Sequence, residues 1–195
     1  MKKFISSMFA CLIVMGYTTT AFAAYDLSNE EVITDNDTAI VVDMNDIDVT
    51  KPHEITKEYV NDHGETVTLR AVYTPVDPTV APMWSNKYDA TVGTWTSYYD
   101  GGILNGMSYD YDVSKSGSHW KISNARNLTA HCILSSITDK SLTINRSTST
   151  SVYPAEVIGI CTVEFIDTPI GHVSSIDAWI KTTISDRGTL TVSGN

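Results

Sequence analysis

The sequence predicts an all-β protein, built as a single antiparallel β-sandwich or barrel. Roughly nine short segments alternate apolar and polar residues with the period of a strand, and they are rich in Thr, Val, Ile and Tyr. Gly, Pro, Asn and Asp gather between these segments, as expected for turns. Beyond the N-terminal leader, no long segment shows the apolar period of a helix. Strand order, and the choice between sandwich and barrel, stay open at this level.

Residues 1–23 have the pattern of a secretory signal peptide. Lys2 and Lys3 precede a mainly apolar run at residues 4–15, and alanines flank Phe22 before the expected cleavage site after Ala23. The run is well short of the roughly 20 residues that a helix needs to cross a bilayer. We therefore expect a secreted, extracellular protein with no stable membrane insertion once the signal is removed.

The exported chain is strongly acidic. Its formal net charge is −10 before cleavage, and removal of two lysines and no acidic residue brings the value to −12 for the remaining 172 residues. Nucleic acids and anionic membranes are bound through Lys and Arg, so neither is an expected partner. Cations and basic partners stay open. The length suits one domain with a substantial core.

Much of the negative charge lies in residues 24–50, which contain neither Lys nor Arg. Such a block is typical of a solvated, mobile arm. We therefore expect a signal peptide over 1–23, an acidic N-terminal arm over 24–50 and a single β-domain over 51–195. An edge strand at residues 39–42 is the alternative for part of the arm.

The β-domain is expected to open with a hairpin. Residues 55–60 and 66–73 alternate apolar and polar side chains on either side of a polar turn at residues 61–65. Three prolines between residues 75 and 82 then interrupt regular structure.

The aromatic stretch at residues 92–122 predicts three consecutive strands. Most of its aromatic residues share one parity with apolar neighbours, which favours a packed core over an exposed platform. The residues of this face are Trp95, Tyr99, Met107, Tyr109, Tyr111, Val113, Trp120 and Ile122. Tyr98 has the opposite parity, so it is the candidate for an outward aromatic contact.

The remainder of the chain predicts further strands and a closing hairpin. Strands are expected around residues 130–135, 142–144, 157–166, 176–184 and 190–192, with a turn at 138–141. The run at 157–166 has apolar residues at both odd and even positions, which is typical of a central strand with a neighbouring strand on each side. Trp179 has the parity opposite to that of its apolar neighbours.

Export would leave two cysteines, Cys132 and Cys161, in segments that both predict strands. Disulfides persist in extracellular compartments, so a bridge between these two residues is one expectation. Two buried free thiols, packed as small apolar side chains, are the other.

Two parts of the aromatic stretch are candidates for ligand binding. One is the outward Tyr98 with the loop that follows it. The other is a pocket lined by tyrosines, because buried hydroxyl groups need hydrogen-bond partners and leave room for a wet cavity. The ligand-binding candidates are Tyr98, Asp100, Asn105, Tyr99, Tyr109 and Tyr111.

A metal site is the weaker hypothesis. Asp110 and Asp112 have the spacing of the first ligands of an EF-hand loop, but Lys115 and Lys121 stand where the loop needs glycine and a bidentate acid. Alternating polar residues on the wet face of a strand explain the pattern better. A weak cation site that combines these two carboxylates with Asp100 stays open.

No catalytic signature is present, and no cofactor is expected. Neighbouring residues on a strand point to opposite faces, so His131 and Cys132 cannot form a nucleophilic pair. The spacings of zinc hydrolases and elbow serines are missing. Acidic pairs that could serve a glycosidase occur in any chain this acidic, so they carry little weight.

The segment Val163-Glu164-Phe165-Ile166-Asp167-Thr168-Pro169-Ile170-Gly171, with the hairpin at 176–192, resembles uncharacterised secreted proteins of Gram-positive bacteria. Those proteins are classed only as domains of unknown function. The resemblance covers the last two-thirds of the chain, and it implies no activity and no site residues.

The functional expectation is therefore a secreted, non-enzymatic β-domain that binds a cell-envelope or other extracellular ligand, such as a glycan or a protein. A secreted glycan or cell-wall hydrolase is one alternative, which would need an acidic cleft. A small antagonistic or signalling protein is another.

Overall fold

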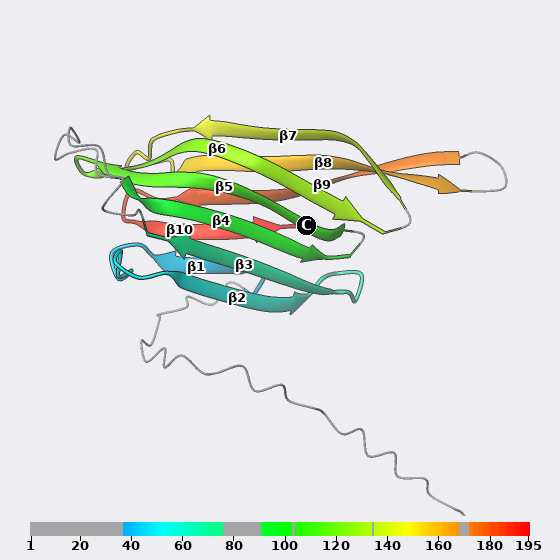
Figure 1. Cartoon of the computed structure of the whole chain (residues 1–195), viewed down its shortest axis with the longest axis horizontal. Helices are drawn as coiled ribbons and strands as arrows, with labels where there is room; N and C mark the ends of the chain where they lie inside the picture. Colours follow the sequence, from blue (N-terminus) through cyan, green and yellow to red (C-terminus); the bar gives the residue numbers. More distant parts are fainter. Residues whose placement is uncertain (1–36, 76–90, 103, 134, 168–171) are drawn as a thin grey trace, which may run out of the picture. The chain divides into compact units, whose positions relative to one another are not determined.

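The computed structural model describes residues 37–75, 91–102, 104–133, 135–167 and 172–195. These residues form ten β-strands in two antiparallel sheets of five strands each (Figure 1). The strands are β1 Ala39–Asp43, β2 His53–Val60, β3 Thr66–Thr74, β4 Thr91–Gly101, β5 Leu104–Ser116, β6 His119–Cys132, β7 Ser136–Arg146, β8 Ala155–Asp167, β9 His172–Ile184 and β10 Thr189–Gly194. The prediction of an all-β, antiparallel fold is confirmed.

One sheet, which we call the aromatic sheet, has the strand order β2-β3-β4-β5-β6. Each of these strands pairs with the next strand in the chain, so the sheet is a plain meander. The predicted first hairpin corresponds to β2 and β3, and the predicted three-stranded aromatic stretch corresponds to β4, β5 and β6. Both local predictions are confirmed.

The second sheet, which we call the C-terminal sheet, has the order β1-β10-β9-β8-β7. Here β1 pairs with β10 along its whole length, with Val41 opposite Thr191. Ile40 and Val42 on this strand are buried, as is Ile47 after it. The folded domain thus begins before residue 51, because these apolar side chains complete the core. The expected signal peptide and the part of the expected arm before residue 37 lie outside the described residues.

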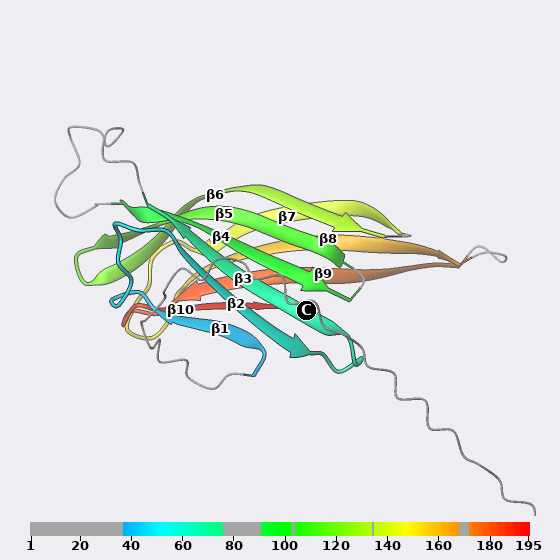
Figure 2. The same ribbon diagram turned by 60° about the horizontal axis from the view of Figure 1, so that its bottom comes forward.

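The two sheets form a sandwich, not a closed barrel. The chain passes between them from β1 to β2 at one edge and from β6 to β7 at the other, as Figure 2 shows. At the second edge, the segment after β7 pairs with the start of β6: Ile122 donates to the Ser147 carbonyl at 2.8 Å, and Ser149 donates to the Trp120 carbonyl at 2.8 Å. The choice left open by the sequence is therefore decided.

The core lies between the sheets and is built from the parity predicted for the aromatic stretch. From Met107 to Val113 of β5 the burial alternates residue by residue, and the inward side chains there are at most 1% exposed. The inward aromatic residues are Tyr73, Trp95, Tyr99, Tyr109, Tyr111 and Trp120. Tyr98 lies on the outer face, where the Arg70 guanidinium stands 4.1 Å from its ring centroid. Burial of the rings supplies much of the apolar area of the core.

A cluster of hydroxyl groups joins the two sheets at the centre of the core. Thr182 of β9 shares a hydrogen bond of 2.9 Å with Ser97 of β4 and one of 2.8 Å with Tyr109 of β5. Ser97 donates to the Tyr111 hydroxyl at 3.3 Å. Burial is the main cause that raises the pKa values of both tyrosines, so both keep their protons. The hydroxyl groups of the cluster thus form hydrogen bonds with one another as neutral groups, in a buried position where an ionised group would be unfavourable.

The outer face of the aromatic sheet carries a second polar network, at two register shifts between β5 and β6. Asn124 and Asn127 have positive φ angles of 56° and 58°. Their side-chain amides donate to Asp112 at 2.9 Å and to Asp110 at 2.7 Å. Asn tolerates this conformation better than most residues, and bulges bend a strand. The network therefore supports the curvature of β6 towards the C-terminal sheet.

The end of the sandwich near the β9–β10 turn is tied by Asp186. Its carboxylate accepts a hydrogen bond from Ser149 at 2.9 Å and lies 2.6 Å from Nδ1 of His119. The Ser149 hydroxyl in turn accepts a bond of 2.9 Å from the backbone N–H of Trp120. One turn of the C-terminal sheet is thereby connected to the start of β6 in the aromatic sheet.

One local prediction was wrong. Residues 138–141 form no turn but the middle of β7, which runs from Ser136 to Arg146. The strand lies at the edge of its sheet, and Thr138, Asp139, Lys140 and Ser141 are all exposed there. Because an edge strand can place polar side chains in water on most of its surface, its sequence resembles a turn. A register shift between Ile137 and Asp139 accommodates the irregular pattern.

Tyr109→Phe tests the hydroxyl cluster. The change should lower the free energy of unfolding by about 1–2 kcal/mol, because it leaves the buried Thr182 hydroxyl without one partner. Tyr98→Phe is the matched control on the outer face, and it should change that free energy by less than about 0.5 kcal/mol. Urea unfolding of both variants measures the difference; equal effects would show that the cluster adds no stability.

Asp186→Asn tests the tie at the β9–β10 turn. Hydrogen bonds from His119 and then Ser149 hold the pKa of Asp186 below its ordinary value. The folded state thus favours the carboxylate, and this stabilisation is complete above the unfolded pKa of about 3.9 and lost as pH falls through the lower folded pKa. The variant should melt below the wild type at neutral pH, and the gap should close in acid. A gap independent of pH would contradict the electrostatic account.

Candidate ligand-binding groove

A groove with a volume of about 550 Å³ lies at the end of the sandwich where β10 ends. The end of β2 and the turn after it form one wall, and the first half of β9 forms the opposite wall. The floor comes from the end of β4 and the start of β5. Both sheets therefore contribute, and the volume is in the range of sites for small ligands.

The turn between β2 and β3 is built around Asn61. Its side-chain oxygen accepts hydrogen bonds from the backbone N–H groups of His63, at 3.0 Å, and Glu65, at 2.9 Å. Its amide donates to the Glu65 carboxylate at 3.0 Å. Asn residues favour such local bonds in turns. As a result, Glu65 is held at the groove instead of extending freely into water.

Two tyrosines close the inner side of the groove. Tyr59 donates from its hydroxyl to the Gly194 carbonyl at 3.1 Å and so joins β2 to the end of β10. Tyr99 is 3% exposed, and a Cβ at position 194 would stand 2.6 Å from its ring. Only glycine at position 194 allows the Tyr99 ring to approach the β10 backbone this closely.

The Tyr99 hydroxyl is the unpaired polar group of the groove. It makes no hydrogen bond to any described residue. The Tyr99 side chain as a whole is 3% exposed, but its hydroxyl oxygen is not among the buried side-chain atoms without a partner in the described part of the chain, so the oxygen is open to the groove. Burial is the main cause that raises the pKa of Tyr99 to about 12, and smaller contributions come from Tyr59, Glu65 and Asp100. The phenol thus keeps its proton and can both donate and accept a hydrogen bond.

Ile176 of β9 supplies an apolar part of the groove. Among the described residues, the pairing of β9 with β10 reaches Gly194 opposite Ile180, and Ile176 lies beyond this paired part of β9. Figures 1 and 2 both show β8 and β9 extending beyond the ends of β4 and β5. Ile176 has the inward parity but is 52% exposed, and Val60 on the opposite wall is 65% exposed. The groove thus has apolar side chains that water can reach.

The charges at the groove are negative. Among the described residues that line it, Asp62, Glu65 and Asp177 are acidic and none is Lys or Arg. Asp177 faces the outer side of its sheet, where it accepts a hydrogen bond of 2.7 Å from Thr162. Of the three lining carboxylates, that of Glu65 contributes to the raised pKa of Tyr99.

The structure separates the six residues that the sequence proposed for ligand binding. Of these, Tyr99 lines the groove. Tyr109 and Tyr111 lie in the hydroxyl cluster of the core, not in a pocket with Tyr99. Tyr98 lies on the outer face, and neither Asp100 nor Asn105 is among the lining residues.

The sequence contains only weak signals for the other groove residues. Tyr59 has the inward parity of its strand, and Glu65 is the last residue of a polar turn. Ile176 has the pattern of an ordinary core residue, and only its 52% exposure shows that it lies at the groove. Proximity of these three residues depends on how the two sheets are placed, which no local pattern reports.

The proposed metal ligands Asp110 and Asp112 already have protein partners. Asp110 accepts hydrogen bonds from Thr96 at 2.7 Å and from Asn127. Asp112 forms a salt bridge of 3.0 Å with Arg126. In the described part of the chain no group of three or more His, Cys, Asp or Glu side chains is placed to hold a metal ion.

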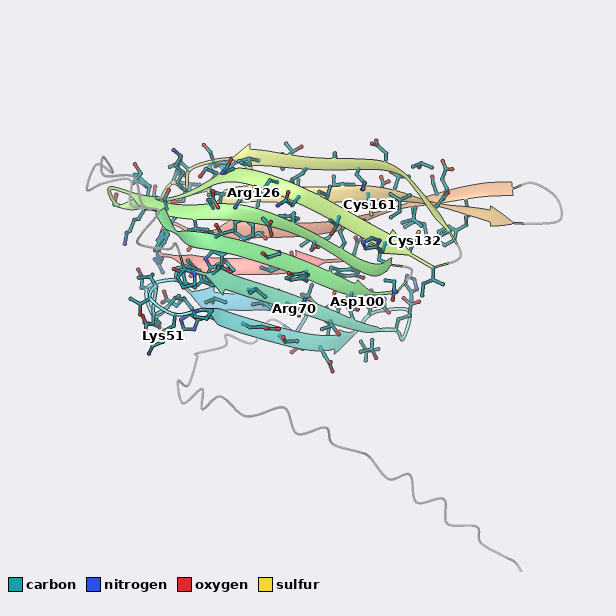
Figure 3. All side chains as sticks on the ribbon, in the orientation of Figure 1. Lys51, Arg70, Asp100, Arg126, Cys132 and Cys161 are labelled. Carbon is teal, nitrogen blue, oxygen red and sulfur yellow. The ribbon has the colours of Figure 1, made fainter. Side chains whose placement is uncertain are left out.

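The two cysteines are free thiols, and the alternative of a disulfide is not realised. Cys132 of β6 donates to the Ser135 carbonyl at 3.1 Å, whereas Cys161 of β8 lies 4.0 Å from the Met107 sulfur. Figure 3 shows both cysteines at the same end of the sandwich as Asp100. Burial is the first cause that raises the pKa of Cys161. A protonated, buried thiol is a poor nucleophile.

Comparison with known proteins adds a structural likeness. No protein-family model matches the sequence, and no curated protein matches it. The fold is similar to the crystal structure of a hypothetical protein, lmo2686, from Listeria monocytogenes EGD-e, with 20% sequence identity and a TM-score of 0.42. The match covers 73% of this chain and 94% of that chain. Among the described residues, no helix is long and apolar enough to cross a membrane.

Alkylation without reductant should distinguish the two thiols. In the native protein Cys132 should react with iodoacetamide, because it is partly exposed, whereas Cys161, at 1% exposure, should react only after unfolding. Mass spectrometry of tryptic peptides measures both sites. A native protein in which neither cysteine reacts even after unfolding would contain a disulfide and would contradict the structure.

Proposed function

We propose that this chain is a secreted, non-enzymatic binding domain that holds a small extracellular ligand in the groove at Tyr99. The observation that carries the proposal is the Tyr99 hydroxyl, which lies at the groove and makes no hydrogen bond to a described residue, although the Tyr99 side chain as a whole is 3% exposed. A ligand that hydrogen-bonds this hydroxyl would replace water there, and the fixed position of the ring lowers the cost of ordering the contact.

The shape of the groove supports a small ligand. Apolar side chains such as Ile176 and Leu104 supply contact area, and one phenol and one carboxylate supply orientation. Few polar groups within mainly apolar walls are typical of sites for small molecules. In line with the resemblance described above, we further propose that the protein is exported by a Gram-positive bacterium.

Binding is favoured over glycan hydrolysis by the exposure of the acidic residues. A glycosidase needs two facing carboxylates, one of which is usually desolvated so that it holds a proton. The groove carboxylates Asp62, Glu65 and Asp177 are exposed, and the first hydrogen-bond partners of Glu65 and Asp177 are neutral side chains. These features suit an electrostatic role better than proton transfer.

Fluorine NMR of the fluorotyrosine-labelled protein tests the proposed function. The labelled protein is mixed in turn with neutral oligosaccharides, organic amines, organic carboxylates and short peptides. We expect at least one class to shift the Tyr99 and Tyr59 signals in a saturable manner, because both rings line the groove. The single variants Tyr99→Phe and Tyr59→Phe assign the two signals.

Tyr98 provides the internal control, since it lies next to Tyr99 in the chain but on the opposite face. Its signal should not move with a groove ligand. If no class shifts the groove signals, the binding function is wrong. Release of reducing sugars from the oligosaccharides would instead establish the hydrolase.

A further inference from the structure

We propose that the ligand of the groove is a small organic cation, an amine or guanidinium group attached to an apolar body. This inference rests on the proposed binding function and specifies its ligand class. It follows from three features of the groove: the sign of its charge, the placement of its apolar walls and the state of its two phenols.

The charge of the groove selects against anions. Glu65 is held at the groove wall by its bond from Asn61, and Asp62 is exposed on the same turn. None of the described lining residues is Lys or Arg; apart from His63 on the same turn, no side chain of the lining can carry a positive charge. A carboxylate or phosphate ligand would therefore meet only like charge, whereas an ammonium group would have a partner.

The apolar walls select against a fully hydrated cation such as a metal ion. Ile176 and Val60 both line the groove, and both are more than half exposed. Leu104 adds a buried apolar surface at the floor. A ligand that covers the exposed surface of Ile176 and Val60 gains from its burial, at about 25 cal/mol per Å² of apolar surface. Only a cation with an apolar body does so.

The two phenols suit an N–H donor. The Tyr59 hydroxyl donates its own proton to the Gly194 carbonyl, which leaves its oxygen lone pairs to accept. The Tyr99 oxygen also has no donor among the described residues. Both rings line the groove, and aromatic faces attract ammonium groups. The groove thus offers acceptors and negative charge to the same head group.

A matched series of three probes tests this inference. Phenethylamine, phenethyl alcohol and hydrocinnamate share one apolar body and differ in the charge of the head group. We expect affinity to fall in that order, with the amine about tenfold tighter than the carboxylate, because ion pairs at exposed sites each change affinity by a few fold. Titration of the Tyr99 fluorine signal measures all three.

Two substitutions locate the charge. Glu65→Gln should weaken phenethylamine about threefold and leave phenethyl alcohol unchanged, since only the ion pair is removed. Asp177→Asn is the matched control, because this residue is at the groove edge but bonds Thr162 on the outer face. It should change amine affinity much less. An unchanged Tyr98 signal and melting temperature show that each variant is folded.

The outcomes separate the inference from the function on which it rests. If the amine and the alcohol bind equally, or the carboxylate binds best, the groove binds ligands but the cation inference is overturned. If an acetylated and amidated Leu-Lys-Leu peptide binds more than about tenfold tighter than phenethylamine, the cation belongs to a protein partner and the small-ligand proposal is wrong. If no probe and none of the wider classes binds, both proposals fail.

Discussion

The contact of the Thr182 hydroxyl with Ser97 and Tyr109 is the interaction on which the arrangement of the two sheets depends. In a strand every second side chain points towards the other sheet, and here several of these inward side chains are tyrosines. Their hydroxyl groups must find partners in the core. Because the Tyr109 hydroxyl of the aromatic sheet bonds Thr182 and Val157 of the C-terminal sheet, satisfying the hydroxyl groups also holds the two sheets in one arrangement.

The two ends of β9 and β10 show what this fixed arrangement permits. At the β9–β10 turn the sheets are joined by Asp186, which bonds Ser149 and contacts His119 of the other sheet. At the other end of these strands lies the groove, where Ile176 is exposed. One end is therefore held by polar contacts, and the other carries the groove with the Tyr99 phenol. Stability and binding capacity are thus placed at opposite ends of the same strands.

Local sequence patterns predicted the strands correctly where one face of the strand is buried in the core and the other face is in water. The alternation along β5 and the turn after β2 are examples, and the outward position of Tyr98 follows from the same rule. The pattern failed for β7, because an edge strand is wetted on most sides and its polar residues resemble a turn. The same pattern also predicted one shared pocket for Tyr99, Tyr109 and Tyr111. The alternation shows which face of the sheet a residue occupies, but it does not show whether the other sheet covers that residue.

The sequence by itself determined the all-β class, the hairpins and the residues of the core, because these depend on side-chain period and turn chemistry within short segments. The tertiary structure decided that the fold is a sandwich, that β1 joins β10, and that Cys132 and Cys161 stay apart. It alone brought Tyr59, Glu65 and Ile176 together around Tyr99. That assembly depends on how the two sheets are placed against each other, a long-range relation that no single strand encodes.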